Sequence, residues 1–247
     1  MAYQIFFREY FQTPPLTRAY TTACFLTSLA VHLDILSPYR LYFHPTLIME
    51  NLQLWRLITP FFYFGDFSLN YLFSMLFTYR CCRMLEEESF RGRPADFLYL
   101  IILGCVIALF FAWFLLLPFL GQSLTTMFVY IWARRNPYVQ MGFFGLFVFR
   151  APYLPWVMVA LSVLFDGDLE TELIGILIGH AYFYFEDVFP YVPGGWRLLA
   201  TPRIFKLLFD GELENSDYHP PAEERPAGFN LGAQEEQANQ QQRNEEN

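Results

Sequence analysis

The side chains that could carry out chemistry in this chain interrupt long apolar stretches. Gly121, Gln122 and Ser123 stand at the start of one such stretch, residues 119–132. This is where an intramembrane serine protease would hold its nucleophile. A serine hydroxyl becomes a nucleophile only when a neighbouring base takes its proton. Whether Ser123 is reactive therefore depends on a base from another part of the chain.

Other polar residues interrupt other apolar stretches. They are Asp66, Asn70 and Ser74 in residues 57–79, Thr125 and Thr126 after Ser123, and His180 in residues 173–189. A polar group in hydrocarbon must find a partner or line a wet cavity. Most such groups make interhelical hydrogen bonds worth about 1 kcal/mol, and that structural role is one alternative. Their grouping favours a polar groove lined by Asn70, Ser74, Gln122, Ser123 and His180.

Composition indicates that the lipid bilayer surrounds these residues. Of the 247 residues, 55% are hydrophobic and 20% are aromatic, too many for an ordinary soluble core of this length. Apolar stretches predict membrane-spanning helices at residues 20–36, 57–79, 97–117, 119–132, 153–165 and 173–189. Several are shorter than the roughly 20 residues that a bilayer normally requires. We expect an all-α membrane protein with six transmembrane helices, targeted by its first helix rather than by a removable signal peptide.

Basic residues predict the orientation of these helices. Arginine and lysine are frequent before the first helix, in every second connection and after the sixth helix, whereas the remaining connections hold only Arg40 and Arg56. The side rich in basic residues faces the cytosol in most membrane proteins. Both termini are therefore expected in the cytosol.

The same pattern divides the chain into four parts. Residues 1–19 and 191–210 are predicted to lie in the cytosolic interface, because apolar and charged residues alternate there. Residues 20–190 form the six-helix membrane domain. Residues 211–247 hold nine acidic residues against Arg225 and Arg243, and few aromatic ones. That composition predicts a disordered acidic cytosolic tail.

The sequence predicts no cofactor, no metal site and no nucleic-acid partner. The four cysteines lack the spacing of a disulfide framework or a zinc finger, although acylation of Cys81 or Cys82 stays open. An EF-hand loop starting at Asp166 would need glycine and glutamate where Thr171 and Leu177 stand. The acidic run at residues 165–172 is therefore interpreted as a solvated turn.

Two further patterns carry a family resemblance. Trp55 and Arg56 follow the first predicted helix on the sparsely charged side, where a guanidinium can hydrogen-bond loop carbonyls while the tryptophan anchors among headgroups. Gly175 and Gly179 lie four residues apart on one face of the sixth helix, which lets a neighbouring backbone approach closely. Together these patterns resemble the rhomboid superfamily. Five segments, at residues 90–97, 133–139, 151–157, 179–190 and 224–229, resemble the derlins more closely.

The derlin resemblance runs from about residue 3 to residue 229. It implies a rhomboid-like bundle in the endoplasmic reticulum membrane that moves misfolded proteins toward cytosolic ubiquitination and proteasomal degradation, linked to the unfolded protein response. The implied partners are the valosin-containing AAA ATPase, a membrane ubiquitin-ligase complex and misfolded substrates, which would enter between the second and fifth helices. Homo- or hetero-oligomerisation stays open.

The resemblance also bears on Ser123. A rhomboid protease has the motif Gly-x-Ser-Gly and a histidine three residues before the glycine pair. Here Leu124 replaces the second glycine, and Glu172 occupies the histidine position. His180 lies eight residues later, roughly 12 Å along a helix. We expect a protein without catalytic residues. The alternatives are an active intramembrane serine protease that uses Ser123 and a small-solute carrier, for which the sequence shows no internal repeat.

The tail matches the family only in part. Derlins commonly end in an ATPase-binding motif, in which an aromatic residue and a glycine precede further glycines and a leucine. This chain offers Phe229 and Gly232, but glutamine and glutamate occupy the following positions. Ordering a disordered segment costs part of its interaction energy. The sequence therefore predicts weak or indirect binding of the ATPase through this tail.

Overall fold

The computed structural model describes residues 10–143, 147–165 and 167–192, together with positions 199, 202 and 205. All of them belong to one compact unit, Met1–Leu213. The predicted acidic tail, with Phe229 and Gly232, lies outside the described residues. So does most of the two predicted interfacial segments.

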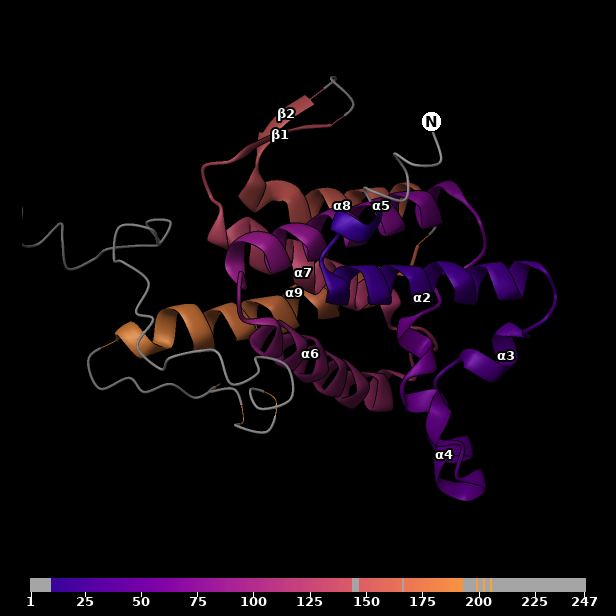
Figure 1. The fold of residues 1–247 in the computed structure, drawn as a ribbon. Coiled ribbons are helices and arrows are strands. Elements are labelled where there is room, and N and C mark those ends of the chain that lie inside the picture. Colours follow the sequence, from indigo (N-terminus) through magenta and orange to yellow (C-terminus); the bar gives the residue numbers. More distant parts are fainter. Residues whose placement is uncertain are drawn as a thin grey trace, which may run out of the picture. The chain divides into compact units, whose positions relative to one another are not determined.

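The described part of the chain is a bundle of helices with one small hairpin (Figure 1). Each of the longer helices falls on one predicted apolar stretch: α2 Pro15–His32, α5 Leu69–Met84, α6 Pro94–Leu115, α7 Gly121–Arg135, α8 Leu154–Leu164 and α9 Leu169–Phe183. Within the described ranges, one helix, α6, is both long and apolar enough to cross a membrane by these criteria alone, and Ala151–Leu164 is a shorter apolar helix.

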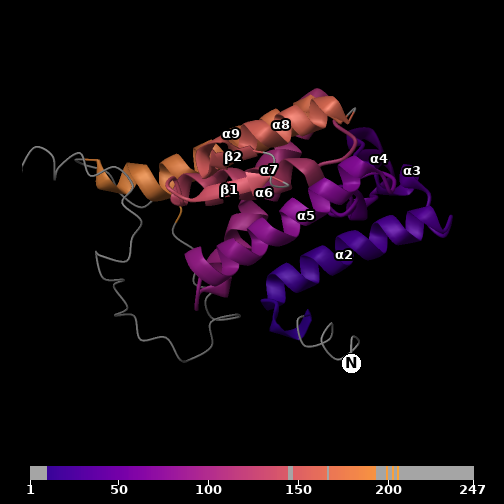
Figure 2. The same cartoon turned by 90° about the horizontal axis from the view of Figure 1, so that it is seen from above.

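Helix α7 is the centre of the bundle. It packs against α5, α6, α8 and α9, as Figure 2 illustrates. Every residue from 123 to 129 is buried, including a serine and two threonines. A helix that is buried on all sides needs either apolar side chains or polar ones that bond locally or to a neighbouring helix. The polar residues of α7 are therefore the first place to look for a site.

The second helix begins later than the sequence predicts. The stretch at residues 57–79 was expected to be helical throughout, but α5 starts at Leu69. Before it lie four short helices: α3 Pro38–Leu41, α4 Pro45–Asn51, η1 Leu54–Leu57 and η2 Thr59–Phe61. Proline stands in the first turn of three of them, where it favours a new helix and prevents the previous one from continuing. Ser68 then caps α5, since its hydroxyl accepts a hydrogen bond from the Tyr71 N–H at 3.2 Å.

Helices α5 and α9 share an unusual ending. Each runs directly into a π-helical turn: η3 Leu85–Ser89 follows α5, and η5 Tyr184–Val188 follows α9. The short helix η6 Phe189–Tyr191 completes the second ending. Turns of this kind are rare and occur frequently at functional sites. Both turns carry acidic residues, and both lie against the end of α7 through the side-chain contacts described below.

The all-α prediction missed a β-hairpin between α7 and α8. Strand β1 Gln140–Phe143 pairs antiparallel with β2 Phe147–Arg150, and Gln140 faces Arg150 in the register. The short helix η4 Ala151–Tyr153 then leads into α8. Aromatic and β-branched residues fit a pleated surface, and they dominate this connection. Figure 1 shows the hairpin standing away from the helices.

Candidate functional site

The two glycines of α9 lie at its closest approach to α7. A Cβ atom on Gly175 would lie 2.7 Å from the Cβ of Thr126 and closer still to the carbonyl oxygen of Ser123. A Cβ on Gly179 would lie 2.8 Å from the Cβ of Tyr130. Non-bonded carbon atoms prefer about 3.5–4.0 Å. The two helices therefore need glycine at both positions to approach this closely.

One turn before Gly175, a carboxylate is enclosed between the same two helices. The side chain of Glu172 is completely buried. Gln122 donates a hydrogen bond from Nε2 to Oε1 of Glu172 at 2.6 Å, and the Thr126 hydroxyl donates to Oε2. The interpretation of residues 165–172 as a solvated turn is therefore wrong for Glu172. Helix α9 begins at Leu169, so Glu172 shares the inward face of Gly175 rather than the exposure of Asp168.

Ser123 lies inside this contact but does not meet a base. Its side chain is buried, and its hydroxyl donates to the Leu120 carbonyl at 3.2 Å. His180 instead bonds Tyr130, with 2.6 Å between Nδ1 and the phenol oxygen. The structure thus brings Gln122, Ser123 and Glu172 together on the first turns of α7 and α9. It leaves His180 two turns away.

A second buried contact joins α7 to α5. The hydroxyls of Thr78 and Thr125 lie 2.5 Å apart, and Thr78 also donates to the Ser74 carbonyl at 2.7 Å. Ser74 itself is buried. Ser74 and Ser123 thus lie in closed seams between helices, while Asn70 and Gln122 are only partly buried and His180 is exposed. A groove that collects all five residues stays a prediction.

Asn70 lies where the N-terminal end of α5 meets the C-terminal end of α8. A Cβ on Gly167 would touch the Ser162 hydroxyl and lie 3.0 Å from the Asn70 amide nitrogen. Nearby, the rings of Phe73 and Phe165 stack with centroids 5.4 Å apart. The Ser162 side chain is 1% exposed, and among the residues that the structure describes its hydroxyl has no hydrogen-bond partner. Ser162 was not predicted as a site residue, although a lone serine in the apolar stretch 153–165 is the same kind of signal as Ser74 or Ser123.

The same two helices flank a cavity farther along α5. It has a volume of about 230 Å³ and lies between α5, the hairpin and the first residue of α8. Its lining is apolar apart from one cation: Phe73, Leu76, Phe77, Arg80, Met141, Gly142, Phe149 and Leu154. The seam between α5 and α8 is therefore closed by rings at one end and hollow at the other.

Arg56 organises the loop between α2 and α5. Its guanidinium donates to Gln53 Oε1 at 2.6 Å and to the carbonyls of Tyr39 and Tyr42 at 3.0 and 2.9 Å. It also lies 4.8 Å from the centre of the Tyr42 ring, within the range of a cation–π interaction. Trp55 next to it is exposed. The arginine therefore fixes the fold of the loop, while the tryptophan faces outward.

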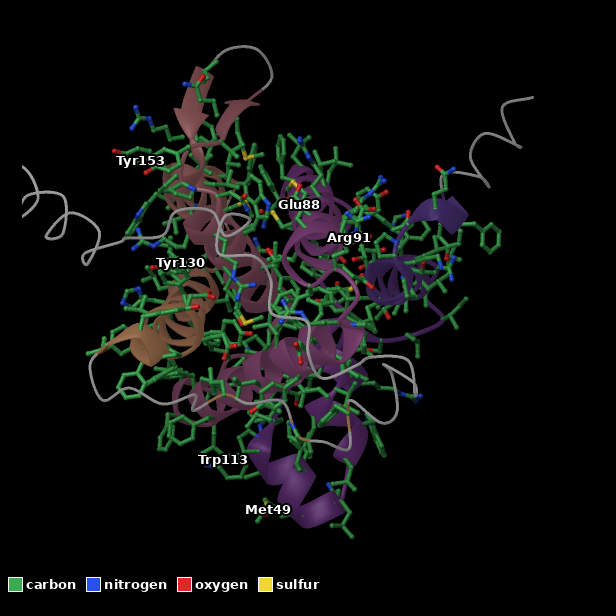
Figure 3. All side chains as sticks on the ribbon, turned by 60° about the vertical axis from the view of Figure 1, so that its left-hand side comes forward. Met49, Glu88, Arg91, Trp113, Tyr130 and Tyr153 are labelled. Carbon is green, nitrogen blue, oxygen red and sulfur yellow. The ribbon has the colours of Figure 1, made fainter. Side chains whose placement is uncertain are left out.

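The π-helical turns hold the far end of α7. Arg135 of α7 forms a two-pronged ion pair with Asp187 of η5, with N–O distances of 2.9 and 3.2 Å. The indole of Trp132 donates to Glu88 of η3 at 3.4 Å. Figure 3 labels Glu88, and also Arg91, which lines a second cavity of about 520 Å³ beside this turn. Both turns are thus tied to the same helix end.

Glu86 of η3 connects the first long helix to this end of the bundle. It accepts hydrogen bonds from the backbone N–H groups of Leu16 and Thr17 at 3.1 and 2.8 Å, and from the Thr17 hydroxyl at 2.6 Å. A carboxylate at a helix N-terminus satisfies donors that the helix itself leaves unpaired. Cys81 and Cys82 lie nearby on α5 and are both buried, so acylation of either thiol would require the helix contacts to open.

Comparisons with known proteins give relatives along most of the chain. The profile of the Der1-like family matches residues 13–203. The chain is 43% identical to Derlin-2.2 of Arabidopsis thaliana over 214 residues, which cover 82% of this chain and 87% of that protein. It is 42% identical to Derlin-2 of Oryza sativa subsp. japonica over 211 residues, 81% of this chain and 84% of that protein. Identity to Derlin-1.1 of Zea mays is 36% over 223 residues, 87% and 90% of the two chains.

Proposed function

Because the chain belongs to the Der1-like family, the family of the derlins, we propose that it is a non-catalytic, rhomboid-like component of endoplasmic-reticulum-associated degradation. It helps misfolded luminal or membrane proteins cross to the cytosol for ubiquitination and proteasomal degradation. One observation supports the absence of catalysis most directly. The position that the rhomboid resemblance assigns to a histidine base holds Glu172, whose two oxygens are already occupied by Gln122 and Thr126.

We also propose that Ser123 is not a nucleophile. A general base must lie within hydrogen-bond reach of the proton it removes. The Ser123 hydroxyl donates its hydrogen bond to a backbone carbonyl, and the histidine of α9 bonds Tyr130 instead. An active serine protease is therefore not favoured. Labelling of Ser123 by a fluorophosphonate would support that alternative.

We place six helices of the chain across the endoplasmic reticulum membrane, with both termini in the cytosol. Large exposed apolar side chains on the outer faces of the bundle support this placement, among them Phe110, Phe114, Val163 and Leu164. Helix α8 has 11 residues and α7 has 15. At 1.5 Å per residue they span about 16 and 22 Å, less than the roughly 30 Å of a hydrocarbon core. The membrane around them would have to become thinner.

The seam between α5 and α8 is the proposed path of the substrate. A peptide group without a hydrogen-bond partner costs several kcal/mol in hydrocarbon. The Asn70 amide and the Ser162 hydroxyl are groups that can bond both the N–H and the C=O of a passing chain. The hollow beneath the hairpin offers space for an apolar side chain next to them.

The force for transport would come from the valosin-containing AAA ATPase, and ubiquitin from a membrane ligase complex. These partners are inferred from the family resemblance. Direct contact of the ATPase with Phe229 and Gly232 is the weaker route, for the compositional reasons given above. We therefore propose that the ATPase is recruited through another subunit.

Site-specific photocross-linking tests the path. A photoreactive amino acid at Leu76, which lines the hollow, should form adducts with a misfolded luminal substrate that accumulate when the ATPase is inhibited. The matched control is Phe110, which is exposed on α6, away from the seam. Adducts of equal yield at both positions would argue against this path. Unchanged degradation in cells that lack the chain would contradict the function itself.

A further inference from the structure

The hollow beneath the hairpin, the cavity of about 230 Å³ described above, has apolar walls and a cation at one end. On α5 its lining residues are Phe73, Leu76, Phe77 and Arg80, separated by three, one and three positions. Residues with this spacing lie on one face of a helix. The helix rises about 10 Å between Phe73 and Arg80, at 1.5 Å per residue. This face therefore presents three apolar side chains and then one positive charge.

The hairpin forms the opposite wall of the hollow. Met141 and Phe149 are paired in the register of β1 and β2, and both line the hollow. Side chains of directly opposed residues stand on the same face of an antiparallel pair. Val148 belongs to the other face and is 70% exposed. The volume lies below the roughly 300–1,000 Å³ of a pocket that encloses a whole small molecule. The hollow therefore fits part of an alkyl chain.

Arg80 provides a positive charge without a counter-ion. Its side chain is exposed, and it forms no hydrogen bond or ion pair with another described residue. Arg83, one turn later on α5, is by contrast paired with Glu87 at 2.9 Å. A guanidinium binds two phosphate oxygens through two parallel hydrogen bonds. A phosphate group at the end of the hollow would therefore compensate this charge.

The proposed membrane placement puts the charged end of the hollow at the level of the lipid headgroups. Tyr153 and Trp156 are 60% and 59% exposed, and they flank Leu154, which lines the hollow. Figure 3 labels Tyr153, which lies next to the hairpin. Tyrosine and tryptophan are enriched where headgroups meet hydrocarbon. Arg80 lies four residues before the end of α5 at Met84, the proposed cytosolic end, so the apolar wall extends from it toward the bilayer centre.

We propose that the hollow binds an anionic phospholipid of the cytosolic leaflet, with its phosphate on Arg80 and part of one acyl chain against Leu76 and Met141. The lipid has its charge outermost and its hydrocarbon inward, which is the order of the lining residues. Anionic lipids are abundant in cytosolic leaflets. A zwitterionic headgroup carries its own cation beside the phosphate and compensates Arg80 less well. The lipid fills the hollow until a side chain of a substrate displaces it.

Two simpler occupants satisfy only one part of the hollow each. A free phosphate ion would meet Arg80 and leave the apolar walls uncovered. An apolar side chain of a substrate would cover the walls and leave the guanidinium without an anion. A phospholipid satisfies both parts, and it is always present around a chain that is embedded in a bilayer.

A photoreactive lipid tests the site in the full-length chain, reconstituted in phosphatidylcholine vesicles. Phosphatidylserine with a diazirine on one acyl chain is added as a minor component, and labelled peptides are identified by mass spectrometry. Labelling is expected on the peptides that contain Leu76 and Phe149. Arg80→Gln should lower it about fivefold, which corresponds to the roughly 1 kcal/mol of one basic residue at an anionic membrane surface. Arg80→Lys should keep most of the labelling, since lysine also binds phosphate.

The charge is controlled with Arg150→Gln. Arg150 is an exposed arginine next to Phe149, but it does not line the hollow. This variant should be labelled like the parent. The same diazirine on a phosphatidylcholine should label the hollow weakly. Equal labelling of Arg80→Gln and the parent would overturn the proposal, and so would equal labelling by the two lipids.

Filling the hollow tests the position of the acyl chain. Leu76→Trp places a larger side chain on its wall and should lower the labelling of the peptide that contains Phe149. Leu72→Trp is the matched control, because Leu72 is an exposed apolar residue of the same helix that does not line the hollow. Labelling of Leu76→Trp at the level of the parent would place the lipid outside the hollow and overturn the proposal.

Because the inference rests on the proposed membrane placement, microsomes that contain the parent chain are also extracted with alkaline carbonate. Release of the chain would remove the membrane premise, and with it both the lipid site and the proposed function. A chain that stays in the membrane but is not labelled in the hollow would overturn the lipid site alone. Degradation of a misfolded luminal substrate is followed in the same cells. Normal degradation by Arg80→Gln with reduced labelling would support a lipid site that is separate from the proposed function.

Discussion

Glu172 is the residue at which this bundle departs most from what its sequence suggests. A carboxylate enclosed between helices is costly unless its oxygens are hydrogen-bonded. Here Gln122 and Thr126 supply both bonds, and the two donors come from one face of α7. The acid therefore works as a joint between α7 and α9. Neighbouring Ser123 contributes only a local bond to its own helix.

Glu172→Ala should destabilise the protein by about 1–3 kcal/mol, because it leaves the Gln122 amide and the Thr126 hydroxyl buried without their acceptor. Glu172→Gln keeps the volume and one acceptor oxygen, so it should cost less. Thermal unfolding of the purified protein in nanodiscs measures both variants. Equal losses would show that the hydrogen bonds contribute little and that packing alone holds the joint.

Ser123→Ala should leave degradation of a misfolded luminal substrate unchanged at equal protein level. The variant removes one hydrogen bond to a carbonyl, a loss of about 1 kcal/mol. No activated nucleophile is lost, since the hydroxyl bonds the Leu120 carbonyl rather than a base. A cycloheximide chase compares it with the parent and with a strain lacking the chain. Loss of degradation as severe as in that strain would revive the protease alternative.

At the scale of elements, the bundle is defined by how closely α9 approaches α7. The sequence predicted the face of α9 from its glycine spacing. Other elements were not predictable in the same way. The apolar run before Leu69 hid the start of α5, although Pro60 and Gly65 were available as signals, and Gly65 does adopt a positive φ of 93°.

Gly175→Val should disrupt the contact between the two helices, because the added carbons would overlap the backbone carbonyl of Ser123. Overpacking of this kind costs roughly 1–3 kcal/mol, and more where backbone cannot move. Gly142→Ala in the hairpin is the control, since a Cβ there meets nothing within 4 Å. The yield of folded protein is measured by gel filtration after detergent extraction. It should fall for Gly175→Val only. Normal recovery of Gly175→Val would mean that α9 can shift without penalty.

At the scale of the whole molecule, the sequence was informative about the fold class but not about the side-chain contacts between helices. The number and approximate position of the long helices follow from apolar stretches. The partners of Glu172 do not, because acidic neighbours made residues 165–172 look solvated. The start of α9 at Leu169 is what turns Glu172 inward. The hairpin was missed because its aromatic residues lie in a short connection between two predicted helices.

The proposed orientation is testable in sealed microsomes. A membrane-impermeant maleimide should label Tyr138→Cys, which precedes the hairpin on the proposed cytosolic side. It should label Met49→Cys in α4 only after the vesicles are opened. The native side chains are 75% and 69% exposed, so access to the reagent is otherwise comparable. Labelling of both in sealed vesicles would contradict an arrangement with both termini in the cytosol.

The distribution of polar contacts around α7 also has a mechanical meaning. Helix α9 is fastened to α7 at one end by Glu172 and at the other by the Arg135–Asp187 ion pair. Helix α5 is tied to α7 through the hydroxyl of Thr78, and the turn η3 that follows it is tied to α7 through Glu88. Within the part of the chain that the structure describes, α8 has no side-chain hydrogen bond or ion pair to another helix. Under a load applied from the cytosol, α5, α7 and α9 would act as a stiff frame, and α8 would be the compliant member that tilts to widen the seam.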